Sequence, residues 1–188
     1  MKLKLVSGPV AEPVPLETAK DHLRVDHSED DALIYGYVTA AREAAEDFTR
    51  RAFGTQTYDL YFDGWPRFPL ALPRAPLQSV TGVFYTDESG DETEWDSSNY
   101  LVDTAAEPGR IVLKRTAALP AVTLQETNGV RVRFVAGHED TPWKVQAAIL
   151  VILGDLYENR ENTVIGAGNS LIEVPYGAKA LLWPIRVL

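Results

Sequence analysis

The chain has 188 residues, of which 45% are apolar and 24% are charged, so it is long enough to bury a core as one domain or as one domain carrying an insertion. The absence of cysteine excludes disulfides, zinc ribbons and thiol nucleophiles. The formal net charge of −9 argues against a protein that grips nucleic acid through phosphate contacts, because such binding needs clustered lysine and arginine.

A short helix is the first regular element that the sequence predicts. Residues 1–14 read as extended or irregular, because their prolines allow a helix to begin only near residue 15. In the next segment, Leu16, Ala19 and Leu23 recur at helical spacing and define one apolar face. We therefore expect a helix over residues 16–23.

The longest helix is predicted over residues 29–51. Ser28 is a suitable N-cap, and three acidic residues follow it in the first turn, where the helix dipole favours negative charge. Two arginines stand at the opposite end, where the dipole favours positive charge. The apolar stripe of this helix consists of Leu33, Ile34, Tyr37, Ala41, Ala44 and Phe48.

Short alternating runs, separated by glycine, proline and aspartate, replace the helical spacing from residue 53 onward. This pattern is typical of antiparallel strands. In the last run, Arg131 and Arg133 alternate with apolar residues and predict a basic, exposed face. The candidate strands are residues 55–62, 68–72, 79–86, 100–102, 110–113 and 130–136.

Helical spacing returns after Thr141-Pro142, a predicted N-cap followed by proline at the first helical position. We expect a helix over residues 143–159, a polar loop, and a short helix over residues 177–183. The predicted fold class is α+β. A core of about four helices is formed by residues 1–52 and 137–188, and residues 53–136 form an inserted antiparallel β module.

The segment 181–188 is more apolar than chain ends usually are. Its residues are Leu181, Leu182, Trp183, Pro184, Ile185, Arg186, Val187 and Leu188. The proline prevents the preceding helix from simply continuing, and each large apolar side chain would stabilise a complex by roughly 1.5–3 kcal/mol if buried. Two interpretations remain open: the segment packs onto its own domain, or it docks on a partner.

No catalytic or metal-binding constellation stands out. His138-Glu139-Asp140 are consecutive residues, which rarely converge on one ion, and Asp26-His27-Ser28 are neighbours that cannot form the hydrogen-bond chain of a catalytic triad. We therefore expect no enzyme activity, no metal and no cofactor. No apolar run is long enough to span a membrane, and we expect no membrane partner.

An alternative stays open in the β region. Trp65, Tyr85 and Trp95 are aromatic residues of the kind that line shallow ligand sites. They leave room for a small-molecule or glycan-acting enzyme, such as a hydrolase, or for a sugar-binding module. A point substitution there would then abolish activity and leave assembly unaffected.

Two separated segments carry a family pattern. In residues 16–26 the sequence reads L-x-x-A-K-x-H-L-R-V-D; an acidic break and D-x-L-I follow, and A-A-R-E-A-A-E occupies residues 40–46. Residues 174–186 combine a proline, a short helix with paired leucines and a basic, apolar tail. Together these segments resemble the tailed-phage head–tail connector family, including its prophage and gene transfer agent forms. The β module departs from the smaller, almost wholly helical members and suits the longer branch of the family.

The resemblance implies a structural adaptor at the head–tail junction of a virion or phage-like particle, assembled in the cytoplasm of the host bacterium. Copies of the chain would form a dodecameric ring that extends the DNA channel beneath the portal. The implied partners are the portal protein, a tail-side stopper or head-closure protein, further copies of the chain, and double-stranded DNA that passes without sequence-specific binding.

The resemblance also assigns roles to residues. Residues 181–188 would dock on the portal, and we expect this tail to be mobile before docking and ordered after it. The ring body would be built by helices that carry Leu16, Leu23, Leu33, Tyr37 and Phe48.

Overall fold

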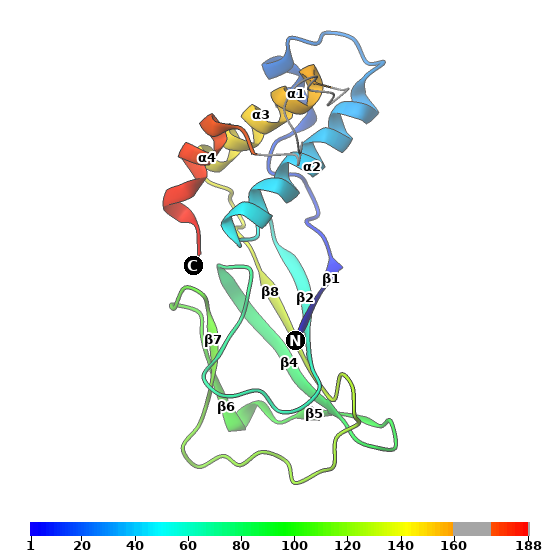
Figure 1. Cartoon of the computed structure of the whole chain (residues 1–188), viewed down its shortest axis with the longest axis vertical. Helices are drawn as coiled ribbons and strands as arrows, with labels where there is room; N and C mark the ends of the chain where they lie inside the picture. Colours follow the sequence, from blue (N-terminus) through cyan, green and yellow to red (C-terminus); the bar gives the residue numbers. More distant parts are fainter. Residues whose placement is uncertain (160–173, 188) are drawn as a thin grey trace, which may run out of the picture. The chain divides into compact units, whose positions relative to one another are not determined.

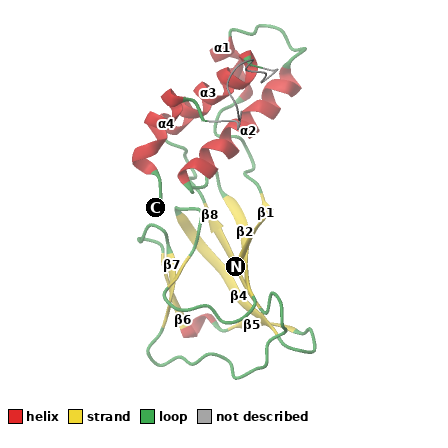
Figure 2. Cartoon of the chain, viewed as in Figure 1, coloured by secondary structure: helices red, strands yellow, loops and turns green. Residues whose placement is uncertain are grey.

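The computed structural model describes residues 1–159 and 174–187. Helices and antiparallel sheets are both present, which confirms the predicted α+β class. The chain forms two compact units (Figures 1 and 2). The strand unit contains Met1–Pro9 and Thr55–His138, and the helical unit contains Val10–Gly54 and Glu139–Leu188.

Among its described residues, the helical unit has four α-helices and a short 3-10 turn. Helix α2 packs against α3, and α3 packs against α4 (Figure 1). The predicted helix over residues 16–23 is present with those bounds. The helices of the unit are α1 (Leu16–Leu23), α2 (Asp31–Thr49), α3 (Trp143–Glu158), α4 (Tyr176–Leu182) and η2 (Trp183–Ile185).

The start of α2 differs from the prediction. The helix begins at Asp31, and its N-cap is Asp30 rather than Ser28. Neither side chain caps the helix: the Asp30 carboxylate instead accepts a hydrogen bond of 2.7 Å from the hydroxyl of Tyr157 on α3. Only the Ser28 backbone takes part, through its carbonyl, which accepts from the Asp31 N–H at 3.2 Å. The start of α3 differs in the same way, because Pro142 is its N-cap and Thr141 provides no side-chain cap.

One face of α2 forms the centre of the helical core. Ile34, Val38, Ala41 and Ala45 are buried there, at spacings of three and four residues. The predicted stripe was displaced by about one position, so Leu33 is 37% exposed. The buried residues that complete this core are Val14, Ala19, Phe53, Val145, Ala148, Ile149, Ile152, Leu153, Ala178 and Leu182.

The strand unit contains two antiparallel sheets. The larger has five strands in the order β1-β2-β8-β4-β5, and the smaller has three in the order β3-β7-β6. Their bounds are β1 (Lys2–Ser7), β2 (Gln56–Phe62), β3 (Leu70–Ala71), β4 (Leu77–Thr86), β5 (Glu92–Trp95), β6 (Tyr100–Asp103), β7 (Arg110–Leu113) and β8 (Val130–Ala136); a 3-10 turn, η1 (Ser97–Asn99), precedes β6.

The five-stranded sheet has one apolar and one charged face. Its apolar face is buried and includes Leu60, Val132 and Phe134, and the rings of Tyr58 and Phe134 stack with centroids 5.6 Å apart. The opposite face carries Arg131 and Arg133 of β8. The prediction that this basic face is simply exposed is wrong, because both arginines bind the buried carboxylate of Asp59 on β2.

Two strands were missed by the sequence reading. Strand β1 falls in residues 1–14, which were expected to be extended or irregular, and it pairs with β2 from Lys2↔Tyr61 to Ser7↔Thr57. This pairing groups the first nine residues with the strands, whereas the sequence placed residues 1–52 with the helices. Strand β5 falls in residues 87–96, which contain six acidic residues and no basic one, and it pairs with β4.

Candidate functional site

The last residues of α4 and the segment that follows them pack against the helical core and the end of α2. Leu182 is fully buried in the helical core, and Leu181 and Ile185 pack against that core while remaining partly exposed. The backbone N–H of Val187 donates to the carbonyl of Thr49 at 2.9 Å, and the Arg51 guanidinium donates to the carbonyl of Ile185. These contacts hold the segment beside the last turn of α2.

Trp183 is the large apolar side chain that this packing leaves outside. It is 63% exposed, and its ring centroid lies 6.2 Å from that of Phe48 on α2. The guanidinium carbon of Arg186 lies 5.6 Å from the Trp183 ring centroid and 5.5 Å from the Phe48 ring centroid, within cation–π range. We call Phe48, Trp183, Pro184 and Arg186 the Trp183 patch.

Residues 181–187 pack on their own unit, which agrees with the first of the two interpretations of this segment; its mobility before docking stays a prediction. A fully buried Leu182 and two hydrogen bonds to backbone carbonyls fix the segment on its own unit. Leu182 therefore has no area left for a partner, and Trp183 and Pro184 are the exposed members of the predicted docking segment. Leu188 lies outside the described residues.

A buried ion triad fixes the segment before α1 to the middle of α2. Arg42 donates to Glu12 through Nε at 2.8 Å and to Glu46 through Nη1 at 2.8 Å, and all three side chains are nearly inaccessible to solvent. Thr39 also donates to Glu12 at 2.9 Å, and the backbone N–H of Phe53 donates to Glu46 at 2.7 Å. The triad thus ties residue 12, α2 and residue 53 together.

Burial disfavours the charge of Arg42, but its partners outweigh this effect. The hydrogen bond to Glu12 and the negative charge of Glu46 raise the pKa of Arg42 above its ordinary value. Sequence reading missed the triad, because Glu12 lies thirty residues before Arg42 in the chain. The available signal was the spacing: Arg42 and Glu46 stand four residues apart and in phase with the buried alanines Ala41 and Ala45.

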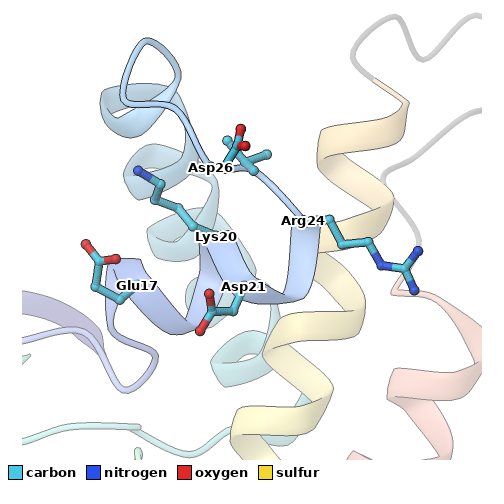
Figure 3. A pocket seen from close by; sticks show the side chains of 6 residues that line it. Glu17, Lys20, Asp21, Arg24 and Asp26 are labelled. Carbon is cyan, nitrogen blue, oxygen red and sulfur yellow. The ribbon is translucent and has the colours of Figure 1, made fainter.

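Two hollows on the surface of the helical unit are shallow. One of about 370 Å³ lies along α1 and the loop that follows, and three acidic and two basic side chains line it (Figure 3). In Figure 3 the Arg24 side chain points away from those of Glu17 and Lys20. A second, mostly apolar groove of about 420 Å³ is lined by Ala40, Ala44, Asp47, Phe48, Ile152, Leu156 and Val174. Neither arrangement pairs a nucleophile with a base.

The aromatic residues of the β region form packing rather than a ligand site. Trp95 is buried, and its ring lies 5.2 Å from Trp65 and 5.5 Å from Tyr100, centroid to centroid. Trp65 in turn lies 5.7 Å from Tyr85. These distances are typical of aromatic pairs in a protein core. The hypothesis of an enzyme or sugar-binding site at Trp65, Tyr85 and Trp95 is therefore unsupported.

Neither a metal site nor a membrane span emerges. Across residues 1–159 and 174–187, no group of three or more histidine, aspartate or glutamate side chains could hold a metal ion, and His138-Glu139-Asp140 form no such group. Within the same residues, no helix combines the length and the apolar character needed to cross a bilayer.

Comparison with known proteins gives the family. The model of the phage gp6-like head-tail connector protein family matches residues 14–106. The chain belongs to this head–tail connector family. The match begins before α1 and extends through β6, so α1, α2 and several strands of the β module lie within the family pattern. A search of curated proteins found no match.

Solved structures show that this connector shares its whole fold with proteins of gene transfer agent particles. A chain from the virion of a native particle is 23% identical, with a TM-score of 0.79. A chain from the neck of an empty particle, computed with C6 symmetry, is 24% identical with a TM-score of 0.76. One from the neck of a native particle, computed with C12 symmetry, is 24% identical with a TM-score of 0.74. Each comparison covers 100% of the connector and 96% of the other chain.

The residues predicted for the ring body lie on two helices of the connector. Leu16 and Leu23 on α1 and Tyr37 and Phe48 on α2 pack partly buried against the helical core. Leu33 on α2 points outward and is the member of this set with the greatest exposure. Their role in a ring stays a prediction.

Proposed function

We propose that this connector is a structural adaptor that forms a ring at the head–tail junction of a phage or phage-like particle, such as a gene transfer agent. It would join the DNA-filled head to the tail and extend the DNA channel. The observation that carries the proposal is the fold: chains from gene transfer agent virions and necks match the full length of the connector with TM-scores of 0.74 to 0.79.

We also propose a dodecameric ring. The related necks were computed with C6 and with C12 symmetry, and a twelvefold axis contains the sixfold one, so twelve copies satisfy both. Closed cyclic rings need two different side faces on every subunit, because each contact joins one face to the other. The helical unit would carry the connector role as a domain, with the strands as an insertion into it.

The proposed portal-docking surface is the Trp183 patch. Interface energy concentrates in aromatic and arginine side chains that a partner covers, and the patch offers the exposed Trp183 with the partly buried Arg186 beside it. The positive charge of Arg186 favours an acidic portal surface. A tail-side stopper or head-closure protein would bind the opposite end of the ring.

The test is co-expression of the connector with the portal protein of its own particle, followed by electron microscopy and affinity capture on the portal. We expect a ring stacked on the portal, and a loss of at least tenfold in portal binding for Trp183→Ala. The matched control is Tyr176→Ala, which removes an exposed aromatic side chain at the start of α4 and should bind like the unmodified chain.

The outcomes separate the parts of the proposal. If no ring forms with or without the portal, the adaptor function is wrong. If rings form and Trp183→Ala binds the portal normally, the docking surface is wrong and the adaptor function stands. Deletion of residues 181–188 is a poor substitute, because it also removes Leu182 from the helical core.

A further inference from the structure

The charged face of the five-stranded sheet is organised in rows that run from edge to edge. One row crosses all five strands, since the register pairs Lys2↔Tyr61, Tyr61↔Arg131, Arg131↔Phe84 and Phe84↔Glu94. Paired residues of antiparallel strands share a face of the sheet. The row therefore has a lysine at the β1 edge and a glutamate at the β5 edge, on the same face.

The interior charges of this face neutralise one another. Arg133 binds Asp59 through two hydrogen bonds of 2.8 Å. Arg131 lies over the Phe84 ring at 4.1 Å, binds Glu92 at 2.7 and 2.9 Å, and reaches Asp59 at 3.4 Å. Two arginines thus face two carboxylates, and the centre of the face has no charge left over.

The two edges keep opposite charges. Lys2 and Lys4 on β1 are exposed, and no ion pair holds either of them within the described part of the chain. At the other edge, Glu94 is exposed and likewise holds no ion pair among those residues. The residues around Glu94 make the β5 edge more negative, because the segment from Asp87 to Asp96 contains six acidic residues and no basic one.

Both edges also have unused backbone hydrogen-bonding groups. Strands β1 and β5 are the outer strands of the sheet, so one side of each has no strand beside it among the described residues. Strand β1 presents apolar surface at its edge, because Leu5 and Val6 are 48% and 45% exposed, and no proline interrupts it. Such edges are normally covered by another strand or another chain.

We propose that β5 of one copy lies along β1 of the next copy, with Glu94 opposite Lys2, and that this contact is one side face of the ring. The proposal rests on the ring assigned under the proposed function. Strand direction fits it: neighbours in the sheet are antiparallel throughout, so β1 and β5 run the same way. A rotation about a ring axis roughly parallel to these strands keeps that direction, and β5 and β1 of neighbouring copies then pair in parallel.

The absence of cysteine from the chain makes the contact testable by disulfide trapping. The double variant Lys2→Cys/Glu94→Cys cannot close a bridge within one copy, because four strand spacings separate the residues by about 19 Å and a disulfide needs Cα atoms closer than about 7 Å. Oxidation of the assembled full-length protein should give a ladder of covalent oligomers that ends at the ring. The matched control replaces Glu94→Cys with Thr116→Cys, an exposed position outside the five-stranded sheet, and should give no ladder.

Each outcome of the disulfide trapping either supports or contradicts the contact between β5 and β1. A ladder from the double variant and none from the control supports it. Rings in the microscope without a ladder overturn the edge contact and leave the adaptor function intact, whereas the absence of any ring removes both. A covalent dimer from Lys2→Cys alone would show two β1 edges meeting each other, which also overturns it.

Charge reversal tests the same contact without a covalent bond. Lys2→Glu or Glu94→Lys alone should weaken ring assembly by about two- to tenfold per contact, because an exposed pair contributes little and the reversed pair repels. The chain that carries both changes should recover, since each contact then again joins opposite charges. Unchanged assembly in both single variants, or failure of the double variant to recover while it remains folded by circular dichroism, would contradict the proposal.

Discussion

At the scale of single residues, Asp59 links the stability of the strand unit to pH. Its carboxylate is buried and accepts hydrogen bonds from Arg131 and Arg133. Burial by itself would raise its pKa, but the hydrogen bond from Arg133 and the positive charge of Arg131 outweigh burial and hold the pKa of Asp59 below its ordinary value of 3.8. The folded protein therefore keeps this carboxylate charged at a pH where the unfolded chain protonates it.

The sign of the pH dependence follows from this shift. Because the folded pKa is depressed, the stabilisation by Asp59 is fully present above the unfolded pKa and is lost as pH falls through the folded pKa, below about 4. We expect Asp59→Asn to lower the free energy of unfolding by about 1–3 kcal/mol at pH 7. The difference from the unmodified chain should shrink as pH drops below 4, measured by urea unfolding at several pH values. A difference that stays constant from pH 7 to pH 3 would exclude this role.

At the scale of elements, the end of the chain serves the fold as well as the proposed docking. We expect Leu182→Ala to lower the free energy of unfolding of the helical unit by about 2–5 kcal/mol, because its side chain is fully buried in the core between α4 and its neighbours. Thermal unfolding of the full chain followed by circular dichroism at 222 nm measures the effect. Trp183→Ala is the control, and its smaller cost reflects an exposed side chain. Equal melting temperatures for Leu182→Ala and the unmodified chain would show that the segment is not part of the core.

The sequence predicted elements better than their contacts. Helices α1 and α3 and strands β7 and β8 lie within one residue of the expected bounds, because each has clear periodicity and is bounded by turn residues. Strand β1 was missed although Lys2, Leu3, Lys4 and Leu5 alternate, since the nearby prolines dominated the reading. Strand β5 was missed because its acidic residues are typical of loops, and it forms through pairing with β4.

The contacts that define the candidate site depend on tertiary structure that local patterns do not encode. Arg42 is thirty residues from Glu12 in the sequence, so its burial follows from a long-range ion pair. The sequence left open whether the apolar end packs on its own domain or docks on a partner, because which of its side chains turn inward depends on the position of α2. Leu182 and Trp183 are adjacent in the sequence, but Leu182 is buried and Trp183 is exposed. Composition alone cannot separate them.

At the scale of the whole molecule, net charge determines whether an adaptor can bind DNA tightly. The chain carries −9 at pH 7, and the two arginines of β8 are engaged by Asp59 and Glu92. Stable binding to double-stranded DNA requires several phosphates to be neutralised by basic side chains, with an affinity that falls steeply as salt rises. A channel wall without clustered basic side chains lets DNA pass without binding it.

We therefore expect the purified connector not to retain double-stranded DNA in a gel-shift assay at about 100 mM salt, even at tens of micromolar protein, in contrast to nonspecific binders, which hold DNA with dissociation constants of about 10⁻⁴ to 10⁻⁶ M. The assay should be repeated on assembled rings, because twelve copies could gather basic residues that one copy scatters. Retention by rings and not by single copies would place a basic surface on the channel wall and reverse the argument from net charge. Absence of retention in both forms would leave the channel to act by confinement and repulsion, which requires no DNA sequence to be recognised.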